Sequence, residues 1–181
     1  PLLYALLLQE GRLLPNSLIP DVPSTINGFR PENFNKDYEG LVPAQRALIR
    51  SLNVPMVHML QQYGLEKFHH ELRALGFSTL NRPPEHYGLT LILGGAEATL
   101  WDIAGAYAGM SRTLAHFYPY DGRYDDAYFR PPHYLQNAET PTPRPHLREA
   151  PRLDAAALWF TFEAMQQLER PDSEGRWERF S

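Results

Sequence analysis

Ser51 and Asn53 are the residue pair of this sequence best suited to act together in a chemical step. A serine hydroxyl can relay a proton, and an asparagine amide can both donate and accept hydrogen bonds. Residues 43–50 and 54–63 both show helical spacing of apolar positions, so the pair lies at a junction between two helices. Both side chains can face one cleft there, although S-x-N is short and has a simpler interpretation. In that interpretation Ser51 ends one helix and Asn53 caps the next.

The elements that would position this junction are mostly helical. Glycines at the expected C-terminal positions, Gly11, Gly64 and Gly76, end three of them. Thr99 opens a longer helix with Asp102 three residues on, as in a capping box. We predict helices over residues 2–10, 43–50, 54–63, 65–75, from Thr99 onward, and 153–169, the last ended by Pro171. The apolar spacing predicts these buried faces: Leu100, Ile103, Ala104, Tyr107 and Leu114 on the Thr99 helix, and Leu153, Ala157, Phe160, Ala164 and Leu168 on the last helix.

Three segments between these helices lack a strong period. Residues 15–42 are punctuated by Pro, Asn, Asp and Gly, which predicts an ordered loop with a short hairpin. Residues 81–95 read as a loop followed by a short apolar strand or turn. Residues 117–152 are rich in Pro, Tyr, Arg and Asp and form a predicted loop-rich insertion, with room for a small hairpin. Its aromatic residues could contact carbohydrate or protein, but self-packing of the loop is favoured: Tyr118, Tyr120, Tyr124, Tyr128 and Phe129.

Composition excludes several classes of function. The 181 residues carry a net charge of −4, so a basic nucleic-acid footprint is absent. Cysteine is absent, which rules out disulfides and cysteine metal sites. No run approaches the roughly 18 apolar residues of a membrane span.

The histidines and glycines do not form a recognisable ligand site. His69 and His70 would point about 100° apart on a helix, so a solvated helix surface is favoured over a metal site. The other histidines considered have no ligand spacing: His116, His133 and His146. Gly94 and Gly95 are not followed by phosphate-loop residues and predict a turn. We therefore expect no metal, no cofactor and no nucleic acid.

Three blocks of the sequence together resemble class A, bifunctional penicillin-binding proteins, nearest to the 1C subgroup. Residues 31–64 resemble the block around the family's S-x-N motif, and they read PENFNKDYEGLVPAQRALIRSLNVPMVHMLQQYG. Residues 91–112 resemble a later helix of the same domain, and they read LILGGAEATLWDIAGAYAGMSR. Residues 1–23 resemble the segment that follows S-x-x-K, and they read PLLYALLLQEGRLLPNSLIPDVP. The blocks occur in family order, which is more specific than any one motif.

The resemblance implies a fold and an activity. The chain would be mainly α with minor β, a helical lobe of the α/β penicillin-binding transpeptidase fold, which is serine β-lactamase-like. Residues 1–181 would be a partial transpeptidase domain. The family's serine acyltransferases use three motifs: S-x-x-K, S-x-N and K-T-G. By resemblance Ser51 is the catalytic relay serine and Asn53 the substrate-binding asparagine. Glu32, Asn33 and Tyr38 lie in a loop resembling a groove-lining segment, and we assign none of them a catalytic role.

Only the middle motif occurs in these 181 residues. No serine is followed three positions later by lysine, and no K-T-G is present. We expect S-x-x-K to end just before Pro1 and K-T-G to follow Ser181. The nucleophile and base would then lie outside this chain, which alone would be inactive.

The parent protein implied by the resemblance is a serine-type DD-transpeptidase of the periplasm. It would cross-link peptidoglycan stem peptides ending in D-Ala-D-Ala, and β-lactams would acylate the same serine. A glycosyltransferase domain and an N-terminal membrane anchor outside this chain are also implied. Two alternatives stay open at this point: a DD-carboxypeptidase or β-lactamase relative, and a non-catalytic helical binding module.

Overall fold

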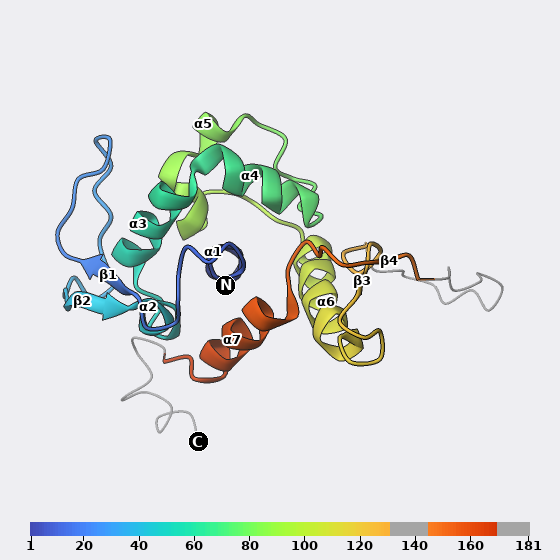
Figure 1. Cartoon of the computed structure of the whole chain (residues 1–181). Helices are drawn as coiled ribbons and strands as arrows, with labels where there is room; N and C mark the ends of the chain where they lie inside the picture. The colour runs from blue at the N-terminus through green and yellow to red at the C-terminus, as the bar shows by residue number, and fades with distance from the viewer. Residues whose placement is uncertain (131–144, 170–181) are drawn as a thin grey trace, which may run out of the picture.

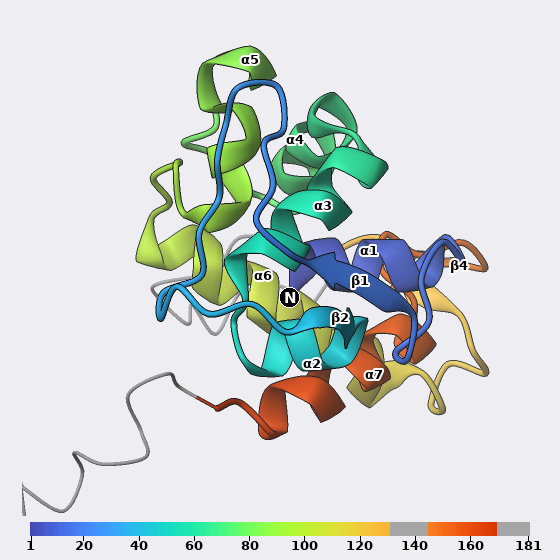
Figure 2. The same ribbon diagram turned by 90° about the vertical axis from the view of Figure 1, so that its left-hand side faces the viewer.

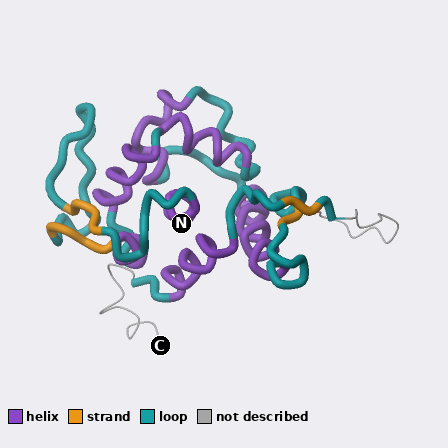
Figure 3. Tube along the Cα trace, viewed as in Figure 1, coloured by secondary structure: helices purple, strands orange, loops and turns teal. Residues whose placement is uncertain are grey.

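The computed structural model describes residues 1–130 and 145–169 and shows a mainly helical chain (Figure 1). Strands are confined, in these ranges, to two small antiparallel pairs (Figure 3). The predicted mainly α chain with minor β is confirmed. In chain order the elements are α1 (Leu2–Gln9), β1 (Leu18–Asp21), β2 (Gly40–Pro43), α2 (Ala44–Ile49), α3 (Asn53–Tyr63), α4 (Leu65–Ala74), α5 (Pro84–Tyr87), the 3₁₀ helix η1 (Gly88–Leu93), α6 (Leu100–His116), β3 (Tyr124–Asp125), β4 (Leu147–Arg148) and α7 (Ala155–Gln166).

Helix α1 occupies the centre of the fold. All five residues from Leu3 to Leu7 are buried, as expected of a helix that is apolar on most sides. Figure 1 shows α1 end-on, with α2, α3 and α4 in an arc on one side and α7 on another. Helices α3 and α7 pack directly against α1. The S-x-N junction is therefore built on helices that share one apolar core.

The strands β1 and β2 form the short hairpin predicted for residues 15–42. They pair antiparallel, with Leu18 opposite Pro43 and Asp21 opposite Gly40. Strand β1 packs against α3. The loop that joins the strands, residues 22–39, extends from the hairpin toward α5 (Figure 2). This long loop is thus placed beside the helix that carries Asn53.

The apolar segment 89–95 holds most of the 3₁₀ helix η1, which ends at Leu93, and no strand, so that prediction is partly wrong. Pro84 starts a short helix at a position where its missing N–H has no cost. The Thr90 hydroxyl donates to the carbonyl of Tyr87 at 2.5 Å, which favours a tight local turn. Gly94 then ends η1 in the left-handed conformation, with φ 92°. The predicted turn at Gly94 and Gly95 is confirmed.

The predicted buried face of α6 is largely wrong. Leu100 is 82% exposed, and Ile103 and Ala104 are also exposed, whereas Tyr107 and Leu114 are half-buried and pack against the core. The side that the helix buries is lined by small or polar residues and one methionine: Gly105, Ala106, Gly109, Met110 and Thr113. Phe129 lies directly against Gly109, where a Cβ would be 2.8 Å from Cε1 of the ring. Close approach of the following loop, rather than apolar periodicity, decides which side of α6 is covered.

Helix α7 is confirmed, with two residues of its predicted face exposed. Leu153, Ala157 and Ala164 are buried, whereas Phe160 and Leu168 are exposed. The helix packs on α1, α2 and α6, and these contacts do not cover Phe160. Pro171 lies outside the described residues.

The aromatic residues after α6 mostly pack on one another, as favoured from the sequence. Tyr124 and Tyr128 are buried, and the rings of Phe117 and Tyr124 lie 6.0 Å apart between centroids. Tyr118 is exposed, although its ring lies edge-on against Phe117 at 5.4 Å between centroids. The small hairpin allowed for in 117–152 is formed by β3 and β4.

Candidate functional site

Ser51 ends α2 in an unusual backbone conformation. Its φ is +52°, in the left-handed region that favours glycine. The Ser51 N–H donates to the carbonyl of Leu48 at 3.1 Å, and the Leu52 N–H donates to that of Ala47 at 2.9 Å. This is the Schellman arrangement, with serine at the position usually held by glycine. The prediction that Ser51 ends a helix is confirmed, and its side chain is exposed.

A left-handed serine carries strain on the order of 1–2 kcal/mol relative to glycine. Such strain persists where the surroundings over-determine the conformation, which is frequent at functional sites. The next residue, Leu52, is buried and holds the turn against the core. The turn at Ser51 is therefore fixed from both sides.

Asn53 does not cap α3, so that interpretation is wrong. It is the first residue of the helix, and its side-chain N–H donates to the carbonyl of Glu32 at 2.8 Å. The cap comes instead from the long loop. Asn33 Oδ1 accepts from the backbone N–H of Asn53 at 2.9 Å and from that of Val54 at 3.2 Å. These are among the helix-start donors that have no partner within the helix.

Asn33 belongs to a buried polar network that we call the Asp21–Asn33 network: Asp21, Asn33 and the start of α3. Asn33 Nδ2 donates to Asp21 Oδ1 at 2.7 Å and to the carbonyl of Asp37 at 2.9 Å. The other oxygen of Asp21 accepts from the Glu39 N–H at 2.9 Å. Asp21 is 0% exposed and Asn33 is 3% exposed. All four hydrogen-bonding positions of the Asn33 amide are occupied.

Sequence reasoning placed Asn33 in a groove-lining loop without a role and did not single out Asp21. The available signal was weak, because Asn and Asp in a loop usually read as turn residues. Only the fold shows that the loop returns to the start of α3.

The histidines do not converge on a metal site in the part of the chain that the structure describes. His69 is buried and stacks on Tyr87 at 5.6 Å between ring centroids, so the solvated surface predicted for it is wrong. The reason is that α4 turns this residue toward α5. His70 is exposed as predicted. His133 lies outside the described residues.

The start of α6 forms one of the two hydrogen bonds of the predicted capping box. Thr99 Oγ1 accepts from the Asp102 N–H at 3.0 Å. The Asp102 carboxylate does not accept from the Thr99 backbone N–H and instead accepts from the Ser78 N–H at 2.9 Å and its hydroxyl at 2.8 Å. Burial alone would raise the pKa of Asp102, but the hydrogen bonds from Ser78 and then Thr99 outweigh it and lower that pKa. The box is thus replaced by a link to the segment after α4.

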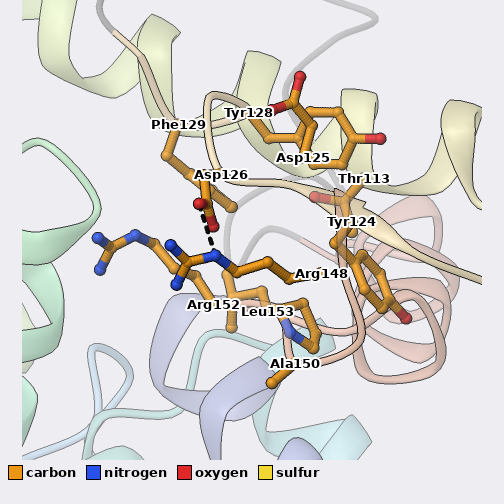
Figure 4. A pocket seen from close by; sticks show the side chains of 11 residues that line it. Thr113, Tyr124, Asp125, Asp126, Tyr128, Phe129, Arg148, Ala150, Arg152 and Leu153 are labelled. Atoms are coloured by element: carbon orange, nitrogen blue, oxygen red, sulfur yellow. Dashed lines mark ion pairs between the residues drawn. The ribbon is translucent and has the colours of Figure 1, made fainter. Parts of the chain in front are cut away.

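A polar hollow of about 380 Å³ lies between the end of α6, the β3–β4 pair and the start of α7 (Figure 4). Asp126 holds Arg148 in it at 2.7 Å. This hollow shares no residue with the S-x-N junction. It offers a charged surface but no pair of groups arranged for acyl transfer.

Comparison with known proteins identifies the class. The family model described as the penicillin binding protein transpeptidase domain matches residues 1–112. Penicillin-binding protein 1C of Escherichia coli (strain K12) is 41% identical over 112 residues, covering 62% of this chain and 14% of that protein. Penicillin-binding protein 1F of Bacillus subtilis (strain 168) is 31% identical over 128 residues, covering 70% of this chain and 16% of that protein.

Solved structures agree with the sequence matches. Penicillin-Binding Protein 1A from Haemophilus influenzae superposes with a TM-score of 0.53 at 27% identity, covering 62% of this chain and 17% of that one. The PonA1 protein from Mycobacterium tuberculosis, solved in complex with penicillin V, gives a TM-score of 0.61 at 18% identity, covering 86% of this chain and 42% of that one. At 18% identity, the likeness to PonA1 shows the fold alone.

The chain belongs to the penicillin-binding protein transpeptidase domain family. The predicted likeness to class A proteins of the 1C type is confirmed by the 41% identity. The chain spans about one seventh of the length of that relative. Within residues 1–130 and 145–169, no helix is both long and apolar enough for a bilayer span.

Proposed function

We propose that residues 1–181 are part of the transpeptidase domain of a DD-transpeptidase that cross-links peptidoglycan stem peptides. The observation that carries the proposal is the geometry of one connection. Ser51 is held in a left-handed turn with its side chain exposed, and Asn53 follows at the first position of α3. Family membership gives that S-x-N pair its chemical context.

In the proposed reaction a serine of an S-x-x-K motif, outside these 181 residues, attacks the carbonyl of the penultimate D-alanine. An acyl-serine bond forms, the terminal peptide bond breaks, and D-alanine leaves as the amine. Ser51 passes the proton that this amine needs, because a serine hydroxyl both donates and accepts. Asn53 hydrogen-bonds the stem-peptide amide. An amine of a neighbouring strand then takes the acyl group and releases the serine.

One further feature supports a domain larger than this chain. Large apolar side chains are exposed on α6 and α7: Leu100, Trp101, Ile103, Trp159 and Phe160. Surfaces of this kind usually pack on other protein segments. We propose that the rest of the transpeptidase domain covers them, and that the full-length protein acts in the periplasm, tethered by an N-terminal anchor.

The test is acylation of the full-length protein by a fluorescent penicillin. The unmodified protein should label, and Ser51→Ala or Asn53→Ala should each slow labelling on the order of 10²–10⁴-fold, the usual contribution of acid–base groups. Ser111→Ala on α6 and Asn81→Ala after α4 are matched controls, since both residues are exposed and neither hydrogen-bonds the pair or Asn33. Labelling of Ser51→Ala at the unmodified rate would contradict the proposal.

The products separate the related activities. With a D-Ala-D-Ala peptide and an acceptor amine, a transpeptidase releases D-alanine and forms the amine adduct. A DD-carboxypeptidase gives only the hydrolysed peptide, and a β-lactamase relative hydrolyses the penicillin. A non-catalytic helical module would neither label nor release D-alanine.

A further inference from the structure

Two successive residues of the long loop hold Asn53 from two directions. The carbonyl of Glu32 accepts from the Asn53 side chain, and the side chain of Asn33 accepts from the Asn53 backbone. Glu32 and Asn33 are about twenty positions away in sequence, so the loop must be in place before the start of α3 is defined. The side chain of Asn53 then has one direction, because both its backbone and its amide are bound.

From this geometry we propose that Asn33 is a positioning residue for the S-x-N pair, with Asp21 as its anchor. The inference rests on the proposed acylation chemistry and adds a residue that touches neither substrate nor nucleophile. Asn33 acts by fixing the first turn of α3 and, through the two-residue connection, the left-handed turn at Ser51.

Asparagine is the side chain that satisfies every neighbour at this position. The N–H groups of α3 require an acceptor, whereas the Asp21 carboxylate and the Asp37 carbonyl require donors. An amide has one acceptor atom with two lone pairs and one donor atom with two hydrogens. Aspartate would face the Asp21 carboxylate with a second charge, and leucine would remove the partner of four groups, two of which lie in buried hydrogen bonds. Burial makes both changes costly, because water cannot substitute.

The network also allows a double variant in which the residues at positions 21 and 33 are exchanged. In Asp21→Asn/Asn33→Asp, the carboxylate at position 33 still accepts from the start of α3, where negative charge is favourable. The amide at position 21 donates to it and accepts from the Glu39 N–H. The Asp37 carbonyl loses its donor and faces a carboxylate oxygen, and this cost remains in the exchange variant. A positioning role therefore predicts that two harmful single changes become less harmful together.

The experiment measures β-lactam acylation by the full-length protein, separating the acylation rate constant from the dissociation constant of the initial complex. Variants are compared well below their melting temperatures, with circular dichroism to confirm folding. We expect Asn33→Asp and Asp21→Asn to lower the rate constant on the order of 10–100-fold, the effect of a small misplacement of reacting groups. The exchange variant should acylate faster than either single variant, as expected if most of the network is restored. Asn81→Asp is the control, since Asn81 is exposed and does not hydrogen-bond the network.

Each other outcome overturns the inference. A folded Asn33→Asp protein that acylates at the unmodified rate shows that the network does not position the pair. A loss that matches the unfolded fraction, with an unchanged rate constant in the folded remainder, shows a role in stability alone. No recovery in the exchange variant excludes the proposed bond pattern. If the unmodified protein does not label, the proposed function fails first. If it labels and depends on Ser51 but not on Asn33, only this inference fails.

Discussion

The central helix α1 and the Asp21–Asn33 network are both buried, but their buried polar side chains differ in whether they are hydrogen-bonded. In α1, Tyr4 is 0% exposed, and its hydroxyl has no hydrogen-bond partner among the described residues. In the network, all four hydrogen-bonding positions of Asn33 are used. Around α1 the fold depends on how well the side chains fill the space, whereas at the network it depends on the direction of the hydrogen bonds.

The difference separates what a core requires from what a site requires. Apolar cores tolerate changes that conserve volume, usually for less than about 1.5 kcal/mol. A buried polar network loses far more when one partner is removed, because the remaining groups stay desolvated. The S-x-N pair lies next to the second kind of region, which suits a pair whose orientation matters.

The largest effect should come from removing the anchor of the network. Asp21→Leu removes one of the two acceptors of the buried Asn33 Nδ2 and the acceptor of the part-buried Glu39 N–H. We expect a loss of about 2–4 kcal/mol in the free energy of unfolding, since each unsatisfied buried group costs about 1–3 kcal/mol. Urea denaturation of the protein measures it.

Asp126→Leu is the matched control for that change. Like Asp21, Asp126 has two partners, which here are the side chains of Arg148 and His146. Its own side chain, however, is 44% exposed. Ion pairs of this kind contribute less than about 1 kcal/mol. Equal losses for Asp21→Leu and Asp126→Leu would remove the distinction between a buried network and a solvated pair.

A smaller effect is expected from relieving the strain at Ser51. Glycine adopts φ near +52° without penalty, whereas alanine retains the clash. Ser51→Gly should therefore be more stable than Ser51→Ala by about 1 kcal/mol, measured by urea denaturation. Both variants lack the hydroxyl, so both should slow β-lactam acylation to a similar extent. A Ser51→Gly protein that acylates much faster than Ser51→Ala would show that backbone geometry, and not the hydroxyl, is what the reaction needs.

Much of the fold could be predicted from local sequence signals, whereas the network could not. Gly64 and Gly76 marked helix ends correctly because a left-handed residue after a helix is a local requirement. The buried side of α6 was missed because it is set by a distant loop, with Phe129 against Gly109. Likewise, the cap of α3 comes from Asn33 and not from Asn53, which is a contact between segments that no local pattern encodes.

The smallest expected effect, and one of opposite sign, concerns Tyr4. Burial, assisted by the negative charge of Glu163, raises the pKa of Tyr4 to about 12, so its hydroxyl stays neutral and unpaired. Tyr4→Phe keeps the ring and removes the unsatisfied group. The free energy of unfolding should stay unchanged or rise by up to about 1 kcal/mol. Tyr63→Phe is the matched control, because the Tyr63 hydroxyl donates to Glu10 at 3.0 Å and its loss should cost about 1 kcal/mol. If Tyr4→Phe were the more damaging of the two in urea denaturation, the α1 core would depend on hydrogen-bond direction as the network does, and the contrast between the two regions would fail.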